Sequence, residues 1–329
     1  MAKRGVLSVV MNMALLMLGI AIGKGFHDNT HNTQNTNKNM PSLEYGTGSM
    51  FDLIAQRYDF VNRALALNMD LSWRRIMVTQ LLDSILAASA SSAGTTTKNY
   101  QPLLCLDLAT GTADVSILLA QQAASSSASS TMIQIKGVDP SANMIAVGRD
   151  KVKEEGLQNI ISLELGDARD LSKFIATDEE GRMDGVTMAF GIRNVPEQER
   201  NKVFCEIHQV LKGRKRGKVA ILEFSEPTLE EGGLVGYYLA RPFIRYIVPW
   251  MGAMLSGKPR EYLHLQNSIA HFPNAAEFTT FLHSLHCPLD QTTKTDTNDD
   301  PQQQQGSFRV DSVTQMNFGS VQLYLATAI

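Results

Sequence analysis

Short apolar runs alternate with segments of helical periodicity along most of the chain. Between the runs, apolar residues recur at helical spacing, as at Val203, Ile207 and Val210. Strands that alternate with helices predict an α/β fold with a doubly wound, mostly parallel sheet. The expected strands lie at 103–108, 132–139, 160–165, 183–189 and 217–224.

The segments before and after these strands predict further elements, namely a hairpin and helices that cover the sheet's edge. The runs at 312–318 and 320–326 follow each other closely, and we expect a C-terminal antiparallel hairpin. Residues 226–281 are rich in aromatic side chains at helical spacing, which predicts a helical cap over the ligand edge. Residues 50–86 also look helical, either as a cap with aromatic core residues or as a lid whose Tyr58 and Asn62 face a ligand.

Changes in composition mark the expected boundaries. Residues 1–26 hold a hydrophobic run behind Lys3 and Arg4, which favours a targeting leader over a retained membrane anchor. Residues 27–49 are rich in Asn and Thr and cannot bury enough surface to fold, so we expect a disordered linker. The folded domain is predicted at 50–329, with polar insertions at 87–98 and 123–131 and a segment 283–307 that ends in a polar, Gln-rich insertion.

Overall composition narrows the class of function. The chain has 329 residues, of which 43% are hydrophobic and 19% charged, as in ordinary globular proteins. A net charge of −3 carries no electrostatic footprint for nucleic acid. Cys105, Cys205 and Cys287 show no CxxC spacing and no His cluster, so we expect three reduced thiols and no metal site.

The first strand ends in a glycine turn. Thr110-Gly111-Thr112 links the run at 103–108 to a helix, which directs backbone N–H groups and a helix N-terminus at a bound ligand. Asp139 ends the next strand, where an acid can accept from ribose hydroxyls. The two features predict a nucleotide-like ligand, but the absence of GxGxxG spacing argues against an NAD-dependent dehydrogenase.

Longer motifs narrow the predicted class of ligand and reaction. They are Phe51-Asp-Leu-Ile-Ala-Gln-Arg-Tyr-Asp-Phe-Val-Asn62, Trp73-Arg-Arg75, Leu106-Asp-Leu-Ala-Thr-Gly-Thr-Ala-Asp114, Val138-Asp139, Gly166-Asp-Ala168, Phe190-Gly-Ile-Arg-Asn-Val195, Val210-Leu-Lys212 and Leu222-Glu-Phe-Ser-Glu-Pro227. Together they resemble the ubiquinone/menaquinone biosynthesis C-methyltransferases, of which the segment 190–195 is the most specific. The resemblance runs from about residue 50 to the C-terminus and implies a Rossmann-like class I methyltransferase fold.

The resemblance implies S-adenosylmethionine as methyl donor and assigns its contacts. The expected cofactor-binding residues are Asp107, Gly111, Thr112, Asp139, Asp167 and Ala168. Asp139 is the ribose acid, and the pair 167–168 lines the adenine. Ala113 stands where the family usually has glycine, and Ala189 where it often has serine. The expected consequence is weaker cofactor binding, especially if position 113 needs a positive φ.

The resemblance also implies the reaction, methyl transfer to a ring carbon of a prenylated quinol. Arg193 is expected to bind the developing phenolate or to polarise a water that takes the proton, since arginine itself stays protonated. Asn194 and Asn62 are expected to orient the quinol oxygens, and Tyr58 to hydrogen-bond the ring hydroxyl. The simpler interpretation of Arg193 is a salt bridge to an acid such as Glu197.

The acceptor and the partners stay open at this point. A 2-methoxy-6-polyprenyl-1,4-benzoquinol of the ubiquinone route is favoured over a demethylmenaquinol or demethylphylloquinol. A methyltransferase-like scaffold without activity is the alternative class. The acceptor's apolar tail implies a membrane, with the mitochondrial inner membrane favoured over a plastid, and a quinone-biosynthesis complex or a homodimer is the partner considered.

Overall fold

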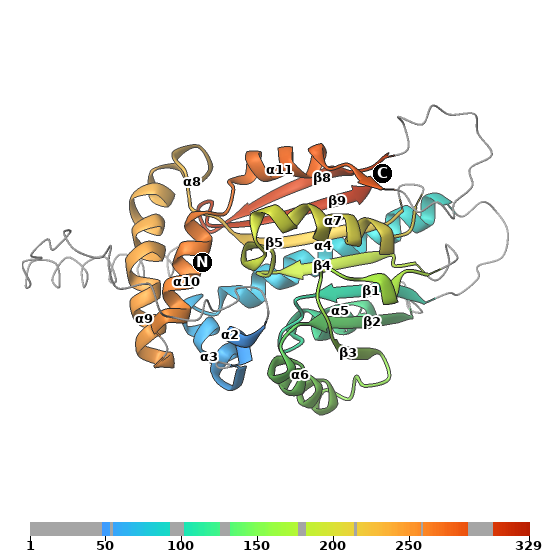
Figure 1. Cartoon of the computed structure of the whole chain (residues 1–329), viewed down its shortest axis with the longest axis horizontal. Helices are drawn as coiled ribbons and strands as arrows, with labels where there is room; N and C mark the ends of the chain where they lie inside the picture. Colours follow the sequence, from blue (N-terminus) through green and yellow to red (C-terminus); the bar gives the residue numbers. More distant parts are fainter. Residues whose placement is uncertain are drawn as a thin grey trace, which may run out of the picture. The chain divides into compact units, whose positions relative to one another are not determined.

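A seven-stranded sheet organises the residues described by the computed structural model, which are 48–52, 55–92, 102–125, 132–176, 182–213, 216–257, 259–288 and 305–329. The first five strands in sequence run parallel, and β9 pairs antiparallel with both β5 and β8. In spatial order the strands are β3 (Ile161–Leu165), β2 (Ile133–Asp139), β1 (Leu103–Leu108), β4 (Gly185–Ala189), β5 (Lys218–Phe224), β9 (Val321–Ala328) and β8 (Phe308–Met316) (Figure 1).

The central strands are apolar along their length because both faces of the sheet are covered. Successive side chains of a strand point to opposite faces. Cys105 therefore joins one buried cluster and Leu106 the other, and Ala220 and Ile221 are divided in the same way. The edge strand β8 has only Phe308 buried and is otherwise half-buried or exposed, and its register shifts between Val310 and Ser312.

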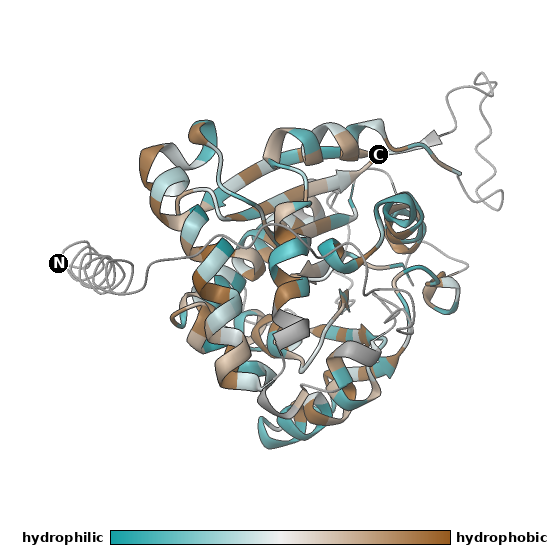
Figure 2. Cartoon of the chain, turned by 60° about the vertical axis from the view of Figure 1, so that its left-hand side comes forward, coloured by the Kyte–Doolittle hydropathy of each residue, from teal (hydrophilic) through white to brown (hydrophobic). Residues whose placement is uncertain are grey.

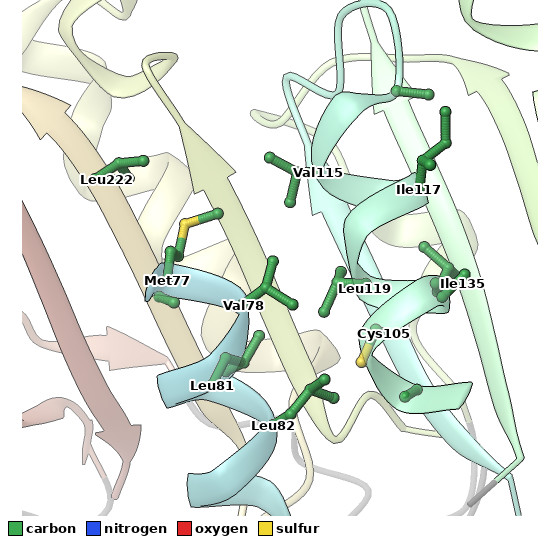
Figure 3. Packing of buried hydrophobic residues seen from close by; sticks show 14 of the residues in the cluster. Met77, Val78, Leu81, Leu82, Cys105, Val115, Ile117, Leu119, Ile135 and Leu222 are labelled. Atoms are coloured by element: carbon green, nitrogen blue, oxygen red, sulfur yellow. The ribbon is translucent and has the colours of Figure 1, made fainter. Parts of the chain in front are cut away.

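Each face is covered by its own set of helices. One face carries α4 (Met69–Ser92), α5 (Asp114–Ser125) and α6 (Ala142–Glu154), and Figure 3 shows Val78 and Leu82 of α4 beside Leu119 of α5. The other face carries α7 (Glu197–Val210), α11 (Ala275–Ser284) and the 3₁₀ turn η1 (Ser172–Phe174). The two layers make the sheet a rigid platform whose strand ends stay available for a site.

A group of helices gathers at the edge where the parallel strands end (Figure 1). Several turns of these helices consist of apolar residues (Figure 2). Among the described residues, no helix combines the length and the apolar character needed to cross a bilayer. The group comprises α2 (Ser49–Asp52), α3 (Ala55–Leu65), α8 (Leu229–Val235), the π-helical turns η3 (Gly236–Ala240) and η4 (Phe243–Ile247), α9 (Val248–Ser256) and α10 (Pro259–Ala270).

The predicted fold class is confirmed, including the doubly wound sheet, the C-terminal hairpin and the helical cap. Two predicted insertions begin too early, because α4 continues to Ser92 and α5 to Ser125. Alanine favours helix, which explains why these Ala- and Ser-rich stretches extend it. The expected leader and most of the linker lie outside the described residues, so the predicted domain boundaries stay a prediction.

The prediction of three reduced cysteines is wrong for two of them. Cys205 on α7 and Cys287 in the short strand β6 (Cys287–Pro288) form a disulfide, with their Cα atoms 5.0 Å apart. β6 pairs with β7 (Gln305–Gly306) in a separate two-stranded ladder. Cys205 and Cys287 are 82 residues apart in the sequence, and no sequence pattern indicated that they would pair. Cys105 is free and buried in β1, as predicted.

Candidate functional site

The carboxyl end of β1 is held by a buried carboxylate. Asp107 accepts hydrogen bonds from the hydroxyls of Thr110 at 2.6 Å, Ser116 at 2.8 Å and Thr187 at 2.7 Å. Burial raises the pKa of Asp107, and these hydrogen bonds oppose that rise. The carboxylate therefore ties the glycine turn to α5 and β4, and a direct contact of Asp107 with the cofactor stays a prediction.

The predicted ribose acid lies against the glycine turn. Asp139 accepts from the backbone N–H of Gly111 and from that of Ser141, each at 2.9 Å. Burial raises the pKa of Asp139 to about 6, and these two backbone hydrogen bonds oppose the rise. The structure therefore brings the ends of β1 and β2 together, as the sequence predicts for a nucleotide-like ligand.

Thr112 belongs to a polar network that joins three helices to the turn. Its hydroxyl donates to Asp59 of α3 at 2.7 Å and accepts from Lys151 of α6 at 3.2 Å. Lys151 also pairs with Asp59 at 2.9 Å and with Asp114, the first residue of α5. Arg63 of α3 reaches Asp114 at 3.2 Å. This set, called the α3 network below, fastens the N-terminal helix over the turn.

The predicted adenine pair follows β3. The carboxylate of Asp167 accepts from the backbone N–H and the guanidinium of Arg169, which also pairs with Glu199 at 2.5 Å. Burial would raise the pKa of Asp167, but the hydrogen bonds from Arg169 hold it below its ordinary value. Ala168 packs against the α7 face of the core. Asp167 is therefore an ionised, half-exposed acceptor at the same sheet edge.

Arg193 sits in η2 (Ile192–Asn194) and forms a buried ion pair with Glu223 of β5. Its Nη1 donates to Glu223 at 2.5 Å and to the carbonyl of Phe190 at 2.7 Å, and its backbone N–H donates to Glu223 at 3.1 Å. Nε is buried and has no hydrogen-bond partner. The arginine has a salt bridge, as the simpler interpretation expected, but to Glu223 rather than Glu197. Its Nε–H remains available to donate to a ligand.

Left-handed backbone conformations gather at this edge. The residues Ala109, Ala113 and Phe190 have φ values of 51°, 69° and 58°. Such values are costly for residues with a Cβ, and they concentrate at functional sites. Position 113 therefore does need a positive φ, which is the condition under which alanine was expected to weaken the site. Gly191 is required by space, since a Cβ there would lie 2.7 Å from that of Ala109.

The lid residue Tyr58 lies close to the arginine. Burial raises the pKa of Tyr58, while the charges of Arg193 and Arg74 and a hydrogen bond with Asn62 lower it. The ring packs edge-on against Phe51 at 6.2 Å between centroids. The structure therefore joins Tyr58 to Asn62 of the same helix and exposes Tyr58 to the charge of Arg193, which is far away in the sequence.

Asn194 completes the predicted acceptor set. Its Nδ2 donates to the carbonyl of Phe190 at 3.4 Å, and its Oδ1 lies 3.3 Å from Nε2 of His264 on α10. Sequence reasoning missed His264 and gave no role to Glu223, Asp59 or Lys151. Glu223 is the second-last residue of β5 and Asp139 the last residue of β2, so the signal of an acid near a strand end could also have found Glu223. No signal in the sequence placed α10 beside η2.

The turn fits S-adenosylmethionine in two respects. Gly111 adopts a φ of 55°, and a Cβ built there would meet no atom within 4 Å, so the turn leaves an open cradle. Each oxygen of Asp139 accepts one backbone N–H and keeps a second lone pair for a ribose hydroxyl. Among the described residues, no cluster of metal-ligating side chains exists.

Comparison with known proteins gives a consistent result. The model of the ubiE/COQ5 methyltransferase family matches residues 39–286. The ubiquinone/menaquinone biosynthesis C-methyltransferase UbiE of Geobacter sp. (strain M21) is 35% identical over 231 residues, which are 70% of this chain and 83% of that protein. The demethylmenaquinone methyltransferase of Bacteroides fragilis (strain YCH46) is 33% identical over 227 residues, covering 68% of this chain and 77% of that protein.

Among solved structures, this chain is similar to the magnesium protoporphyrin IX methyltransferase of Synechocystis PCC 6803, determined with bound S-adenosylmethionine. The TM-score is 0.45 and the sequences are 14% identical. The match covers 89% of this chain and 99% of that one.

Proposed function

The chain belongs to the ubiE/COQ5 methyltransferase family, and from this membership and the geometry of the site we propose which acceptor it methylates. It is an S-adenosylmethionine-dependent C-methyltransferase of quinone biosynthesis. The proposed acceptor is a prenylated benzoquinol of the ubiquinone route, 2-methoxy-6-polyprenyl-1,4-benzoquinol. The observation that supports an oxygenated aromatic acceptor is the buried Arg193. Its Nε has no hydrogen-bond partner, and its charge acts on Tyr58.

The residues of the site divide the work of the reaction. When bound, S-adenosylmethionine supplies an electrophilic methyl group, so the protein has to align the ring carbon and raise its nucleophilicity. Arg193 binds the negative charge that develops on the ring oxygen, and Glu223 holds the guanidinium in place for that contact. Tyr58, Asn62 and Asn194 orient the ring oxygens through hydrogen bonds. The aromatic wall of Phe190 and Phe224, stacked at 4.5 Å between centroids, excludes water.

The cap suggests how a prenylated acceptor arrives. Large apolar side chains on α8, η3, η4 and α9 are exposed, with Leu234 at 72% and Trp250 at 63%. Tyr246, Trp250 and Met254 follow one another at helical spacing. Amphipathic aromatic residues favour the membrane interface. We propose that this surface rests on the bilayer that holds the quinol.

The location follows from that proposal. An organellar membrane is the proposed site of action, with the mitochondrial inner membrane as the first candidate. Fractionation of the native protein tests it. Recovery in the soluble fraction at ordinary salt would contradict the membrane contact, and recovery in plastids would correct the organelle.

The contact itself is tested with vesicles of phosphatidylcholine and cardiolipin. The variant Tyr246→Ser/Trp250→Ser/Met254→Ser should lose most co-sedimentation, since burial of each large apolar side chain contributes about 1.5–3 kcal/mol. The matched control Met132→Ser/Ile329→Ser removes exposed apolar residues at the opposite edge of the sheet, before the start of β2 and after the end of β9. Equal losses from both variants would contradict a specific surface.

The acceptor is tested by turnover. Purified protein is supplied with S-adenosylmethionine and, in separate reactions, with a short-chain methoxy-prenyl-benzoquinol or a short-chain demethylmenaquinol, and the products are identified by mass spectrometry. Methylation of the benzoquinol alone or in preference is expected. Preference for the naphthoquinol would assign the menaquinone route, which the name of the Bacteroides relative describes for that protein. Failure to methylate either quinol would favour the scaffold.

A further inference from the structure

The motif Trp73-Arg-Arg75, near the start of α4, packs against residues at the ends of β4 and β5. The Trp73 ring lies edge-on to Phe190 at 6.3 Å and to Phe224 at 5.9 Å between centroids. The guanidinium carbon of Arg74 lies 5.3 Å from the centroid of the Phe190 ring. Phe190 directly follows β4, which pairs in parallel with β1. The indole therefore holds this turn of α4 at the strand ends, with Arg74 over Phe190.

The charge of Arg74 acts on groups at the glycine turn and at the acceptor residues. Burial raises the pKa of Asp107, of Asp114 and of Tyr58, and the charge of Arg74 opposes burial at each of them. Asp107 and Asp114 lie on either side of the glycine turn, and Tyr58 comes from α3. Coulomb interactions weaken with distance, so the guanidinium lies near all of these groups. Its side chain is only 10% exposed, which keeps the charge between them.

One edge of this guanidinium is free for a ligand. Nη1 donates to Asp70, one helical turn earlier, and the ion pair holds the side chain in place. The hydrogen bonds that the structure describes leave Nε and Nη2 of Arg74 without a partner, and neither nitrogen is fully enclosed. Nε and Nη2 share one edge of the planar group, and such an edge binds a carboxylate through two parallel hydrogen bonds. Arg74 is therefore prepared to bind a carboxylate.

The cofactor brings a carboxylate for which the turn supplies no cation. In S-adenosylmethionine, a short carbon chain joins the sulfonium to the carboxylate of the methionine moiety. The sulfonium has to lie between the glycine turn and Arg193 for its methyl group to face the acceptor, so the carboxylate has to lie close to that space. In the α3 network, Lys151 and Arg63 are balanced by two carboxylates, and Arg193 is paired with Glu223. Arg74 offers two donors to the same space.

We propose that Arg74 binds the methionine carboxylate of S-adenosylmethionine through Nε and Nη2. The proposal rests on the cofactor part of the proposed function and is independent of the choice of acceptor. Asp70 is then a positioning residue, because it holds Nη1 and so orients the free edge. The contact fixes the chain next to the sulfonium, which helps to align the methyl group with the ring carbon. It also selects against nucleosides that lack the carboxylate, such as 5′-methylthioadenosine.

The first test compares two sulfonium nucleosides that differ only in the carboxylate. S-adenosylmethionine and its decarboxylated form are titrated by calorimetry into wild type, Arg74→Met and Arg75→Met, which changes the exposed neighbouring arginine. Wild type and Arg75→Met should bind S-adenosylmethionine about 10–100-fold more tightly than the decarboxylated form, as expected for hydrogen bonds between charged groups. Arg74→Met should lose this preference and still bind the decarboxylated form within threefold of wild type. A retained preference, or equal weakening of both ligands, would overturn the proposal.

A second pair of variants allows for the buried acid, since Arg74→Met leaves Asp70 without its cation. Asp70→Asn/Arg74→Gln removes both charges, whereas Asp70→Asn removes only the acid. The preference for the carboxylate should be lost in the double variant and kept in Asp70→Asn. If the double variant kept it, the carboxylate would be bound elsewhere. If Asp70→Asn lost it as completely as the double variant, the integrity of this turn of α4 would set the preference and the direct contact would be wrong.

The same titrations separate this contact from the proposed function, because binding is measured without a quinol. Wild-type protein that binds both nucleosides with equal affinity would overturn the role of Arg74 and leave the methyl donor in place. Wild-type protein that binds neither nucleoside would contradict the proposed function and the carboxylate contact together. Loss of the preference in Arg74→Met, with the preference kept in Arg75→Met, is the result that supports Arg74 as the binder.

Discussion

The two halves of the site differ in how their polar groups are satisfied. In the turn half, at the ends of β1 and β2, Asp107, Thr112 and Asp139 all bond to neighbouring protein groups. In the arginine half, at the ends of β4 and β5, Arg193 keeps Nε without a partner although its side chain is only 7% exposed. Leaving a buried donor unpaired costs about 1–3 kcal/mol.

This difference matches the two tasks that the halves are proposed to perform. A site for a constant ligand can be built from groups that hold one another in place before the ligand binds. A site that stabilises charge only during the reaction needs a donor whose best partner appears in the transition state. The unpaired nitrogen of Arg193 is such a donor, and the predictions below test whether the halves act separately.

The largest effect is expected in the arginine half. Arg193→Ala should lower methyl transfer by a factor of about 10²–10³ or more, as removal of a preorganised donor does. The cofactor Kd, measured by calorimetry, should stay within threefold because the hydrogen bonds that the structure describes for Arg193 run to Glu223 and Phe190. Unchanged turnover would show that the arginine has only a structural role.

A control is needed because Arg193→Ala leaves Glu223 buried without its cation, which costs about 3–5 kcal/mol. Arg193→Lys keeps a charge for Glu223 but loses the planar fork, so it should fold more stably and still transfer methyl groups poorly. If Arg193→Lys recovered both stability and activity, the loss of activity in Arg193→Ala would be due to impaired folding.

The turn half should respond to pH through Asp139. The carboxylate that accepts from a ribose has to be ionised, and its pKa is raised to about 6. Cofactor affinity should therefore fall about tenfold per unit as pH drops below 6. Folding stability should change with pH in the opposite direction from cofactor affinity. The pKa of Asp139 is higher in the folded than in the unfolded protein, so its stabilising contribution is present at low pH and is lost as pH rises through about 6.

Calorimetric titration with S-adenosylmethionine from pH 5 to 8 measures this dependence. Asp139→Asn should bind more weakly at pH 7.5 and show a flat profile between pH 5 and 7. An Asp139→Asn variant that retains the wild-type profile would assign the titration to another group.

The sequence predicted the turn half better than the arginine half, for a physical reason. The elements of the turn half are consecutive, so Gly111 and Asp139 could be placed together by the rule that parallel strands end at one edge. The arginine half collects Tyr58 from α3, Glu223 from β5 and His264 from α10. Contacts between such distant elements depend on packing that no local pattern encodes. The cysteine pair was missed for the same reason.

The α3 network should give a moderate effect on stability. Lys151→Met leaves Asp59 and Asp114 without their shared cation and should reduce the free energy of unfolding by about 1–3 kcal/mol at pH 7. The matched control Lys173→Met breaks the more exposed pair with Glu164 and should cost less than about 1 kcal/mol. Urea denaturation measures both.

The pH dependence of the stability lost in Lys151→Met shows whether the loss comes from the ion pairs of the α3 network. Burial raises the pKa of Asp114, but the charge and hydrogen bond of Lys151 together with the charges of Arg74 and Arg63 outweigh burial and leave the pKa below its ordinary value. The stability that this group contributes is therefore present above its unfolded pKa and lost as pH falls through the folded one. The difference between wild type and Lys151→Met should shrink toward acid pH. A constant difference would point to lost packing of the lysine stem.

The smallest effect is expected at Ala113, where the turn half carries backbone strain. A φ of 69° is unfavourable for alanine and not for glycine. Glycine also makes the unfolded chain more flexible, and the net effect of Ala113→Gly should be a free energy of unfolding higher by about 0.5–1 kcal/mol. Relaxing the turn should also tighten the cofactor a few-fold. Ala120→Gly, in the regular part of α5, should instead destabilise by about 1 kcal/mol. If both glycine variants lose stability equally, the left-handed turn is not strained, and weak cofactor binding would need another cause.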